Sequence, residues 1–375
     1  MSDLTLQTVL AQHLVDYSRS HRLDGQRLKV LRHLLVCHTP ALGGLKLQCN
    51  HCDHHPLRYH GCRDRHCPQC QSRASRRWCE HQQQAVLPVT YYHVVFSLPH
   101  ELNGWVQLHP KVIYDRLFQC VWKTLKAFGA DPKRLGGQLG MTAVLHTWGS
   151  NLSQHVHLHC LVPGGALGAD HQWHAAKSNY LFPVKALSRH FRGSMVSTLR
   201  QAYQTGALHR VTRQDIDARL NALMAKDWVV YSKHGLRRSD SIIGYLARYS
   251  HRIAISDQRL IALDDKGISF HYRDYRNKQQ ATLRLPVDEF IRRYLMHILP
   301  KGFMRIRHYG YLANRCRQRA LDIIRRVLTK ATRVTDAPPQ PAPAEPNWPC
   351  PVCKQGRLII IERILPQAII HLQPG

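Results

Sequence analysis

Residues 155–162 read His155-Val156-His157-Leu158-His159-Cys160-Leu161-Val162, so that three histidines alternate with apolar side chains. In a β-strand, the side chains at i, i+2 and i+4 lie on one face. The alternation therefore predicts a strand with one apolar face towards the core and three imidazoles on the other. A lone histidine is usually structural, but two or three on one rigid strand form a preorganised site for a divalent metal ion. We therefore favour metal binding here.

Segments around this strand predict a chain of mixed α and β structure. Residues 89–98 are β-branched and aromatic, and we expect further strands there, at 142–147 and at 228–232. Helical periodicity predicts helices over most of residues 1–40 and at 111–128, 186–206, 212–225, 239–251, 287–298 and 311–330. Short strands are expected within 253–285, around the turn Asp264-Asp265-Lys266-Gly267.

Changes in composition divide the chain into six segments. We expect a helical segment at 1–44 and a cysteine-rich zinc-binding module at 45–86. A domain at 87–260 would contain the histidine strand and the predicted helix 239–251, which carries Tyr245 and Tyr249. A basic region at 261–333, a proline-rich linker at 334–349 and a tail with a single C-x-x-C pair at 350–375 complete the chain.

Charge points to a polyanionic partner. Lys and Arg number 53 against 24 Asp and Glu, a formal net charge of +29. An enzyme of small-molecule metabolism rarely tolerates such self-repulsion, whereas a bound nucleic acid relieves it. The charge therefore argues against the former class of protein. A hydrophobic content of 44% excludes a wholly disordered chain. No run approaches the roughly 18 apolar residues of a membrane span, and the first residues show no secretory pattern, so a cytoplasmic, nucleoid-associated protein is expected.

Two C-x-x-C pairs, separated by 14 residues, predict one zinc site with the ligands Cys49, Cys52, Cys67 and Cys70. Cys62 and His66 lie between the pairs, and two alternatives are open for them: they replace one of the four ligands, or they add a second ion. The surrounding arginines suggest a DNA-contacting surface, although any single one is more often simply solvated; they are Arg63, Arg65, Arg73, Arg76 and Arg77. The third pair, Cys350 and Cys353, is half a site whose partner is open: another chain, His371 or nothing.

Tyr245 and Tyr249 are spaced i and i+4, which places two phenols on one face of a predicted helix. A phenol with a pKa of about 10 is a weak nucleophile. Beside a phosphodiester polarised by a metal ion it can attack and form a covalent phosphotyrosine. Ile242, Leu246 and the two tyrosines also form a stripe typical of a core-facing helix. The histidine strand and the charge favour the catalytic interpretation.

Five stretches together resemble one family. They are residues 62–70 (CRDRHCPQC), 92–99 (YHVVFSLP), 155–165 (HVHLHCLVPGG), 245–256 (YLARYSHRIAIS) and 290–310 (FIRRYLMHILPKGFMRIRHYG). In this order they resemble the insertion-sequence 91 family of rolling-circle transposases, a two-tyrosine branch of the HUH (His-hydrophobic-His) endonucleases. The resemblance spans residues 45 to about 315.

The resemblance implies an α+β fold: an antiparallel HUH nuclease palm of the ferredoxin or RRM type, an N-terminal helical and zinc-binding module, and a helical basic C-terminal part. His157 and His159 would hold Mg²⁺ or Mn²⁺, and Tyr245 and Tyr249 would be the nucleophiles. The cysteines would match the family's zinc-binding domain. The family often has proline where this chain has Val156, so the third metal ligand is open: His155, His93 or another group.

The implied reaction cuts and rejoins single-stranded DNA at the element's ends through a 5′-phosphotyrosine. The chain has no P-loop, so host helicase or replication machinery would displace the strand. Further DNA contacts are expected from Arg248, Arg252, Arg305 and Arg307. Two alternatives remain open at this stage: a plasmid replication initiator or relaxase of the same chemistry, and a non-catalytic zinc-containing DNA-binding protein.

Overall fold

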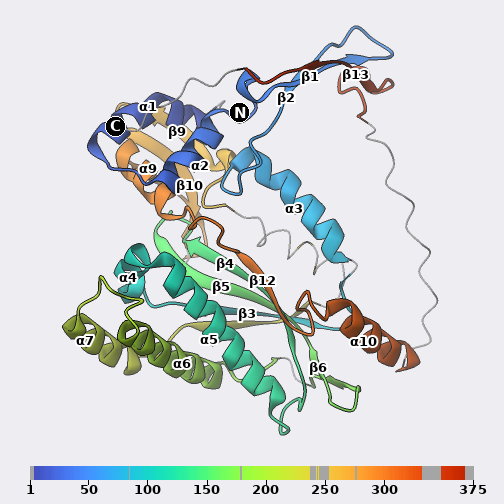
Figure 1. Ribbon diagram of the computed structural model, residues 1–375. Coiled ribbons are helices and arrows are strands. Elements are labelled where there is room, and N and C mark those ends of the chain that lie inside the picture. The colour runs from blue at the N-terminus through green and yellow to red at the C-terminus, as the bar shows by residue number, and fades with distance from the viewer. Residues whose placement is uncertain are drawn as a thin grey trace. The chain divides into compact units, whose positions relative to one another are not determined.

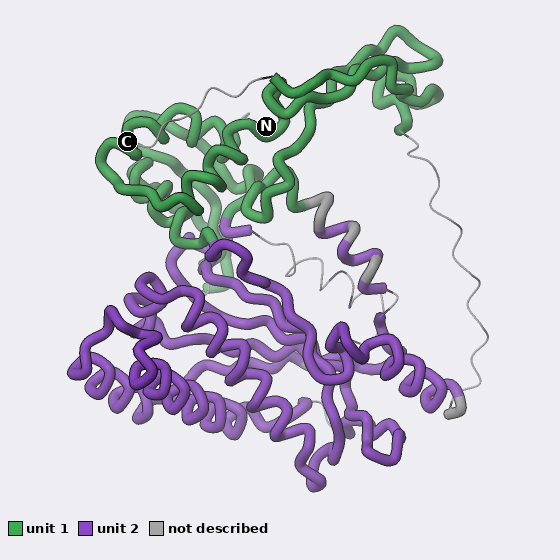
Figure 2. The backbone as a smooth tube through the Cα atoms, viewed as in Figure 1, with its two compact units in different colours: residues 1–74, 255–298, 335–375 green, residues 75–254, 299–334 purple. Residues whose placement is uncertain are grey.

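The computed structural model describes residues 4–83, 85–177, 180–236, 242, 244, 253–274, 277–331 and 348–367 (Figure 1). The chain forms two compact units (Figure 2). Unit 1 combines residues 1–74, 255–298 and 335–375, and unit 2 combines 75–254 and 299–334. Each unit therefore assembles segments from distant parts of the chain. The expected α+β class is confirmed, with antiparallel sheets in both units.

A five-stranded antiparallel sheet forms the centre of unit 2. Its order is β12 (Ile306–Gly310), β4 (Gly140–Trp148), β5 (Gln154–Pro163), β3 (Tyr91–Ser97) and β8 (Val230–Leu236). Four of these strands match sequence predictions within a few residues. The edge strand β12 was not predicted, because its five residues are flanked by polar loops and none is buried.

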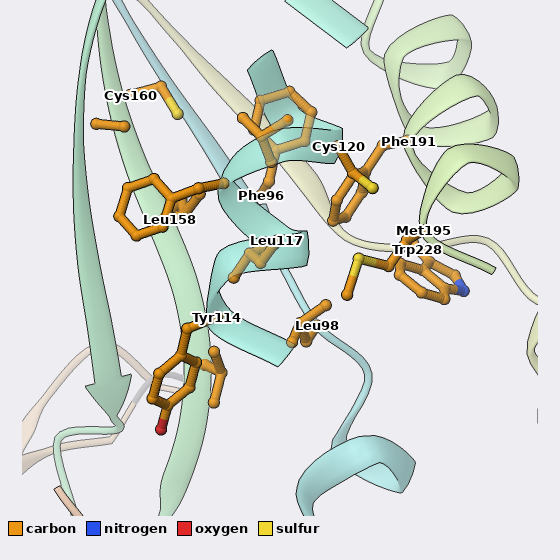
Figure 3. Packing of buried hydrophobic residues seen from close by; sticks show 14 of the residues in the cluster. Phe96, Leu98, Tyr114, Leu117, Cys120, Leu158, Cys160, Phe191, Met195 and Trp228 are labelled. Atoms are coloured by element: carbon orange, nitrogen blue, oxygen red, sulfur yellow. The ribbon is translucent and has the colours of Figure 1, made fainter. Parts of the chain in front are cut away.

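Two long helices cover one face of this sheet. They are α5 (Pro110–Ala130) and α6 (Val184–Gln204), with α7 (Arg213–Met224) packed on α6 and α4 (Asn103–Leu108) beside α5. Phe96, Leu158 and Cys160 point from the strands towards Leu117 and Phe191 on the helices (Figure 3). All five side chains are fully buried. This is the main hydrophobic core, and the residues of β5 that enter it are those that alternate with the histidines.

The opposite face of the sheet carries a smaller apolar cluster. Tyr91 and Leu161 pack there with Ile242 and with residues of α10 (Arg317–Ala331). Leu161 follows His159 by two positions in β5, so this cluster lies on the same face as the histidines. A short hairpin of β6 (Gly165–Leu167) and β7 (Trp173–Ala175) extends from the end of β5.

Unit 1 contains a helical part and a β-ribbon. Helices α1 (Leu6–Ser20) and α2 (Gly25–Leu35) begin at the side-chain caps Thr5 and Asp24. With them lie a three-stranded sheet of β9 (Leu260–Asp264), β10 (Gly267–Arg273) and β11 (Gln280–Leu285), and α9 (Val287–Met296). The predicted turn before Gly267 is confirmed; at its φ of +130° a Cβ would meet the carbonyl oxygen of Leu285, so only glycine fits.

The ribbon joins the two ends of the chain. Its strands are β2 (Leu57–Tyr59), β1 (Gly44–Cys49) and β13 (Leu358–Ile364), with β1 in the middle and both neighbours antiparallel. Helix α3 (Pro68–Gln83), which runs from unit 1 into unit 2, was not predicted, because the sequence there is dominated by polar residues. Among the described residues, every helix is too short or too polar to span a bilayer.

The core position of Leu158 gives a test of the fold. We expect Leu158→Ala to lower the free energy of unfolding by about 2–5 kcal/mol, because it leaves a cavity between the sheet and α5. Leu108→Ala makes the same chemical change at a side chain that is 42% exposed and serves as the control. Urea denaturation measures both. Equal effects of the two substitutions would contradict the described packing.

Candidate metal centres

Three imidazoles converge on the face of the unit 2 sheet opposite α5 and α6, which we call the histidine face. The register of β4 and β5 places His146 opposite His157, and His159 follows on the same face. One ring nitrogen from each of the three lies within 4.8 Å of the others. The Nε2 atoms of His157 and His159 are 3.1 Å apart. Two ligand nitrogens at bond lengths of about 2.1 Å and right angles lie about 3.0 Å apart, so this spacing suits a shared cation.

Neighbouring groups orient two of the rings. The Nδ1 of His157 is 2.9 Å from the carbonyl oxygen of His155, to which it donates, and this leaves Nε2 for a metal. The Nδ1 of His159 lies 2.9 Å from Nε2 of His93. Burial, together with the charge of Lys233, lowers the pKa of His93 to about 4. His93 is therefore neutral at physiological pH and can accept the Nδ1 proton of His159.

The donor set fits a divalent transition metal. His146 and His157 are only 3% and 9% exposed, and no aspartate or glutamate among the described residues joins the three histidines. Three nitrogen ligands leave coordination positions open for substrate oxygens. Imidazole is a better ligand for Mn²⁺ than for Mg²⁺, which prefers oxygen, so Mn²⁺ fits these residues better.

The structure thus brings His157 and His159 together as the sequence suggested. The side chain of His155 is exposed and is not one of the converging three. Its ring lies against that of His157, with centroids 4.6 Å apart, and its carbonyl oxygen accepts the hydrogen bond from Nδ1 of His157. His93 contacts His159 but is not one of the converging three. Sequence reasoning missed His146. It lies in a segment predicted as a strand, but the register that sets it opposite His157 is not visible from either strand alone.

The cysteines form two tetrads, and the single predicted tetrad is corrected. Cys67 and Cys70 group with Cys37 and Cys62, whereas Cys49 and Cys52 group with Cys350 and Cys353. The ribbon explains the division, because β1 ends at Cys49 beside the start of β13. The two C-x-x-C pairs near the N-terminus therefore serve different clusters. Of the two alternative ligands expected from the sequence, Cys62 and His66, Cys62 belongs to the tetrad with Cys37.

The tetrad of Cys37, Cys62, Cys67 and Cys70 has the dimensions of a metal site. Sulfur–sulfur distances are 3.6 Å for Cys37–Cys70, 3.8 Å for Cys62–Cys70 and 3.5 Å for Cys37–Cys67. A tetrahedral zinc site with Zn–S bonds of about 2.3 Å has edges of about 3.8 Å. Hydrogen bonds from the Cys62 and Cys67 thiols lower the pKa of Cys37, whereas the contacts of Cys67 with Cys37 and Cys62 raise the pKa of Cys67. A bound cation would allow all four sulfurs to be thiolates at once, because its charge offsets their mutual repulsion.

His66, the other alternative ligand, has a structural role. Its Nδ1 and its backbone N–H each lie 2.9 Å from Oδ1 of Asp64, and its carbonyl oxygen accepts a hydrogen bond from the Tyr294 hydroxyl. Burial alone would raise the pKa of Asp64, but the hydrogen bonds from His66 and His33 outweigh it and lower that pKa. These contacts fix the loop that carries Cys62 and Cys67.

The proposed DNA-contacting arginines differ in their surroundings. Arg63 and Arg76 are exposed, and Arg65 is half-buried. Arg305 is buried, and Arg307 pairs with Asp115 at 2.5 Å and stacks over Phe118, so neither offers a free cation to DNA. Other proposed residues lie outside the described part of the chain: Tyr245, Tyr249, Arg248 and Arg252, and the side chains of Arg73 and Arg77.

Comparison with known proteins identifies the class. A family model described as "Putative transposase" matches residues 140–320, which include the histidine face, and one described as "Transposase zinc-binding domain" matches residues 9–98. A protein named putative transposase y4qJ, from Sinorhizobium fredii, is 38% identical over 91% of this chain and 90% of its own. The transposase for insertion sequence element IS801, from Pseudomonas savastanoi pv. phaseolicola, is 28% identical over 80% of this chain and 73% of its own.

These sequence comparisons identify the chain as a transposase. No solved structure matches the chain. The match to the zinc-binding domain and the two relatives identify the family as well as the class. The chain belongs to the insertion-sequence 91 family of transposases.

The choice between His146 and His155 as third ligand can be tested by calorimetric titration with Mn²⁺. We expect His146→Ala to weaken binding at least tenfold, because it removes one of three converging nitrogens. His155→Ala keeps the backbone carbonyl that orients His157, so its affinity should stay within about twofold of the parent. The opposite ranking would show that the described register does not define the site.

Cys37 provides a test of the first tetrad. We expect Cys37→Ser to lose one zinc ion per chain and to lower the temperature of unfolding, because three remaining thiolates close the tetrahedron incompletely. Cys79→Ser, at a buried cysteine outside both tetrads, controls for the loss of a thiol. Elemental analysis by mass spectrometry counts the zinc. Unchanged zinc in Cys37→Ser would exclude Cys37 as a ligand.

Proposed function

We propose that this transposase nicks and rejoins single-stranded DNA at the ends of its element through a 5′-phosphotyrosine, in rolling-circle transposition. The observation that carries the proposal is the convergence of His146, His157 and His159 on the sheet face opposite α5 and α6. These residues would hold Mn²⁺ or Mg²⁺. When bound, the ion would act as a Lewis acid that polarises the scissile phosphate.

The surroundings of the histidines suit a phosphate ligand. Lys233 is exposed on β8 directly opposite His93 in β3, so its ammonium lies on the histidine face. We assign it to the DNA backbone, where one cation contributes a sequence-independent contact. His93 keeps the ring of His159 in place, and the buried Val156 and Leu158 hold the strand against the core.

The proposed nucleophiles are Tyr245 and Tyr249. Support comes from Ile242, whose side chain is buried with Tyr91 and Leu161 on the histidine face. Tyr245 follows Ile242 by three residues in the sequence, and Tyr249 by seven. In the proposed step the phenolic oxygen loses its proton and bonds to phosphorus, and the P–O3′ bond breaks. The leaving oxygen takes a proton and becomes a free 3′-OH.

This exchange of one phosphodiester for another conserves the bond energy, so rejoining needs no ATP. The second tyrosine would cut at the other end of the element. Strand displacement is assigned to a host helicase or to replication. Family membership favours transposition over a plasmid replication initiator or relaxase of the same chemistry.

We further propose that Cys37, Cys62, Cys67 and Cys70 hold one structural zinc ion. That ion would join the end of α2 to the first turn of α3, which begins at Pro68. Gly61 allows this approach, because a Cβ there would lie 2.8 Å from the sulfur of Cys70. The exposed Arg63 and Arg76 are the proposed DNA contacts of this module.

The covalent intermediate is directly testable. The protein is incubated with end-labelled single-stranded DNA from the element's ends and Mn²⁺, and a denaturing gel then separates covalent adducts. We expect a shifted band that disappears with a chelator, in His157→Ala, and in the double variant Tyr245→Phe plus Tyr249→Phe. Mn²⁺ should support the band at lower concentration than Mg²⁺.

Tyr231→Phe is the matched control for this experiment. Tyr231 lies on β8 on the histidine face and is 53% exposed, so it is the tyrosine most easily mistaken for a nucleophile among the described residues of that face. Its substitution should leave the band intact. A band that survives the double variant, or that Tyr231→Phe abolishes, would refute the assignment of the nucleophiles.

A further inference from the structure

The second cysteine tetrad unites the two ends of the chain. The sulfurs of Cys49 and Cys353 are 3.7 Å apart although 304 positions separate them, and those of Cys52 and Cys350 are 3.8 Å apart. All four sulfurs lie within 4.8 Å of one another. The match to a zinc-binding domain ends at residue 98 and therefore includes only half of this tetrad.

These distances fit a tetrathiolate metal site and not a pair of disulfides. A disulfide requires a sulfur–sulfur distance of about 2.05 Å. The edge of a zinc–thiolate tetrahedron with bonds of about 2.3 Å is about 3.8 Å, close to both measured distances.

Each C-x-x-C pair also has the backbone of a zinc knuckle. The N–H of His51 points at the sulfur of Cys49 at 3.4 Å, and that of Gly356 at the sulfur of Cys353 at 3.3 Å. A Cβ on Gly356 would lie 2.5 Å from the Cys49 sulfur, so the residue must be glycine for the two knuckles to meet. Asn50 and Arg357 are joined by two further hydrogen bonds, of 2.8 and 3.1 Å.

Hydrophobic packing around this tetrad is small. Among the described residues, Leu47 and Leu358 are the only buried members of the cluster beside the cysteines, and Leu45 and Trp348 are half-buried at its margin. Ile359, Ile360 and Ile361 of β13 are 43–49% exposed. So few buried side chains contribute little against the entropy of ordering a segment of about twenty residues. The ribbon therefore needs another source of stability.

We propose that Cys49, Cys52, Cys350 and Cys353 bind a second structural zinc ion, which fastens the C-terminal segment to the N-terminal module. The proposal is independent of the nuclease chemistry. Because each end of the chain supplies two of the four thiolates, the site is complete only when residues 348–364 pair with β1. Zinc binding and the pairing of β13 with β1 are then one coupled equilibrium.

Zinc counting on the full chain tests the ligand set. We expect Cys350→Ser plus Cys353→Ser to lose one zinc ion per chain, and Cys49→Ser plus Cys52→Ser to lose the same single ion. The quadruple variant should also lose only one, because both pairs serve one site. Cys316→Ser, at a cysteine outside both tetrads, should lose none. Unchanged zinc in either double variant, or a loss of two in the quadruple variant, would overturn the proposal.

A second measurement keeps all four cysteines intact. A protease cleavage sequence is inserted between residues 337 and 346, and the cut protein is examined by native mass spectrometry. The C-terminal fragment should remain bound, one copy per chain, and a zinc chelator should release it. Release of the fragment with zinc present would contradict the proposal that zinc fastens the C-terminal segment to the N-terminal module. Retention only in complexes with two copies of the chain would assign the site to a dimer and would also contradict it.

Discussion

The histidine site depends on one cross-strand pair, His146 of β4 opposite His157 of β5. Side chains alternate between the faces of a sheet, so a slip of one residue would turn His146 towards the helices α5 and α6 and Leu145 towards His157. The core prevents this slip, because Leu145, Val156 and Leu158 are buried on the helix side. The apolar residues of these strands thus set the register that assembles the polar site.

We propose that metal ions stabilise the parts of the chain where buried apolar residues are scarce. Unit 2 has a large core, but the ribbon of unit 1 buries few side chains and gathers four cysteines at one end. The first tetrad, with Cys37, joins the turn after α2 to the start of α3. Such sites would suit a chain with a net charge of +29, because thiolate–metal bonds would hold the backbone while the basic side chains stay in solvent for DNA.

Local patterns in the sequence predicted most of the sheet and about half of the residues that gather in the three candidate metal clusters. The alternation at residues 155–162 identified β5, His157 and His159, since a period of two is a property of the strand itself. His146 was missed because strand register is a non-local property. The cysteine pairs were recognised from their spacing, but spacing does not tell which pairs meet. Cys37 has no neighbouring cysteine to mark it, and β13 pairs with a strand some 300 residues earlier.

The central claim is that one divalent ion lies between three imidazoles on the face of the sheet that also buries Ile242. Anomalous diffraction at the manganese absorption edge, from crystals of the full chain grown with Mn²⁺, tests it most directly. We expect a peak bonded to the Nε2 atoms of His157 and His159 and to a ring nitrogen of His146, with the hydroxyl of Tyr245 or Tyr249 on the same side of the sheet. A peak elsewhere, or both hydroxyls on the side of α5 and α6, would contradict it.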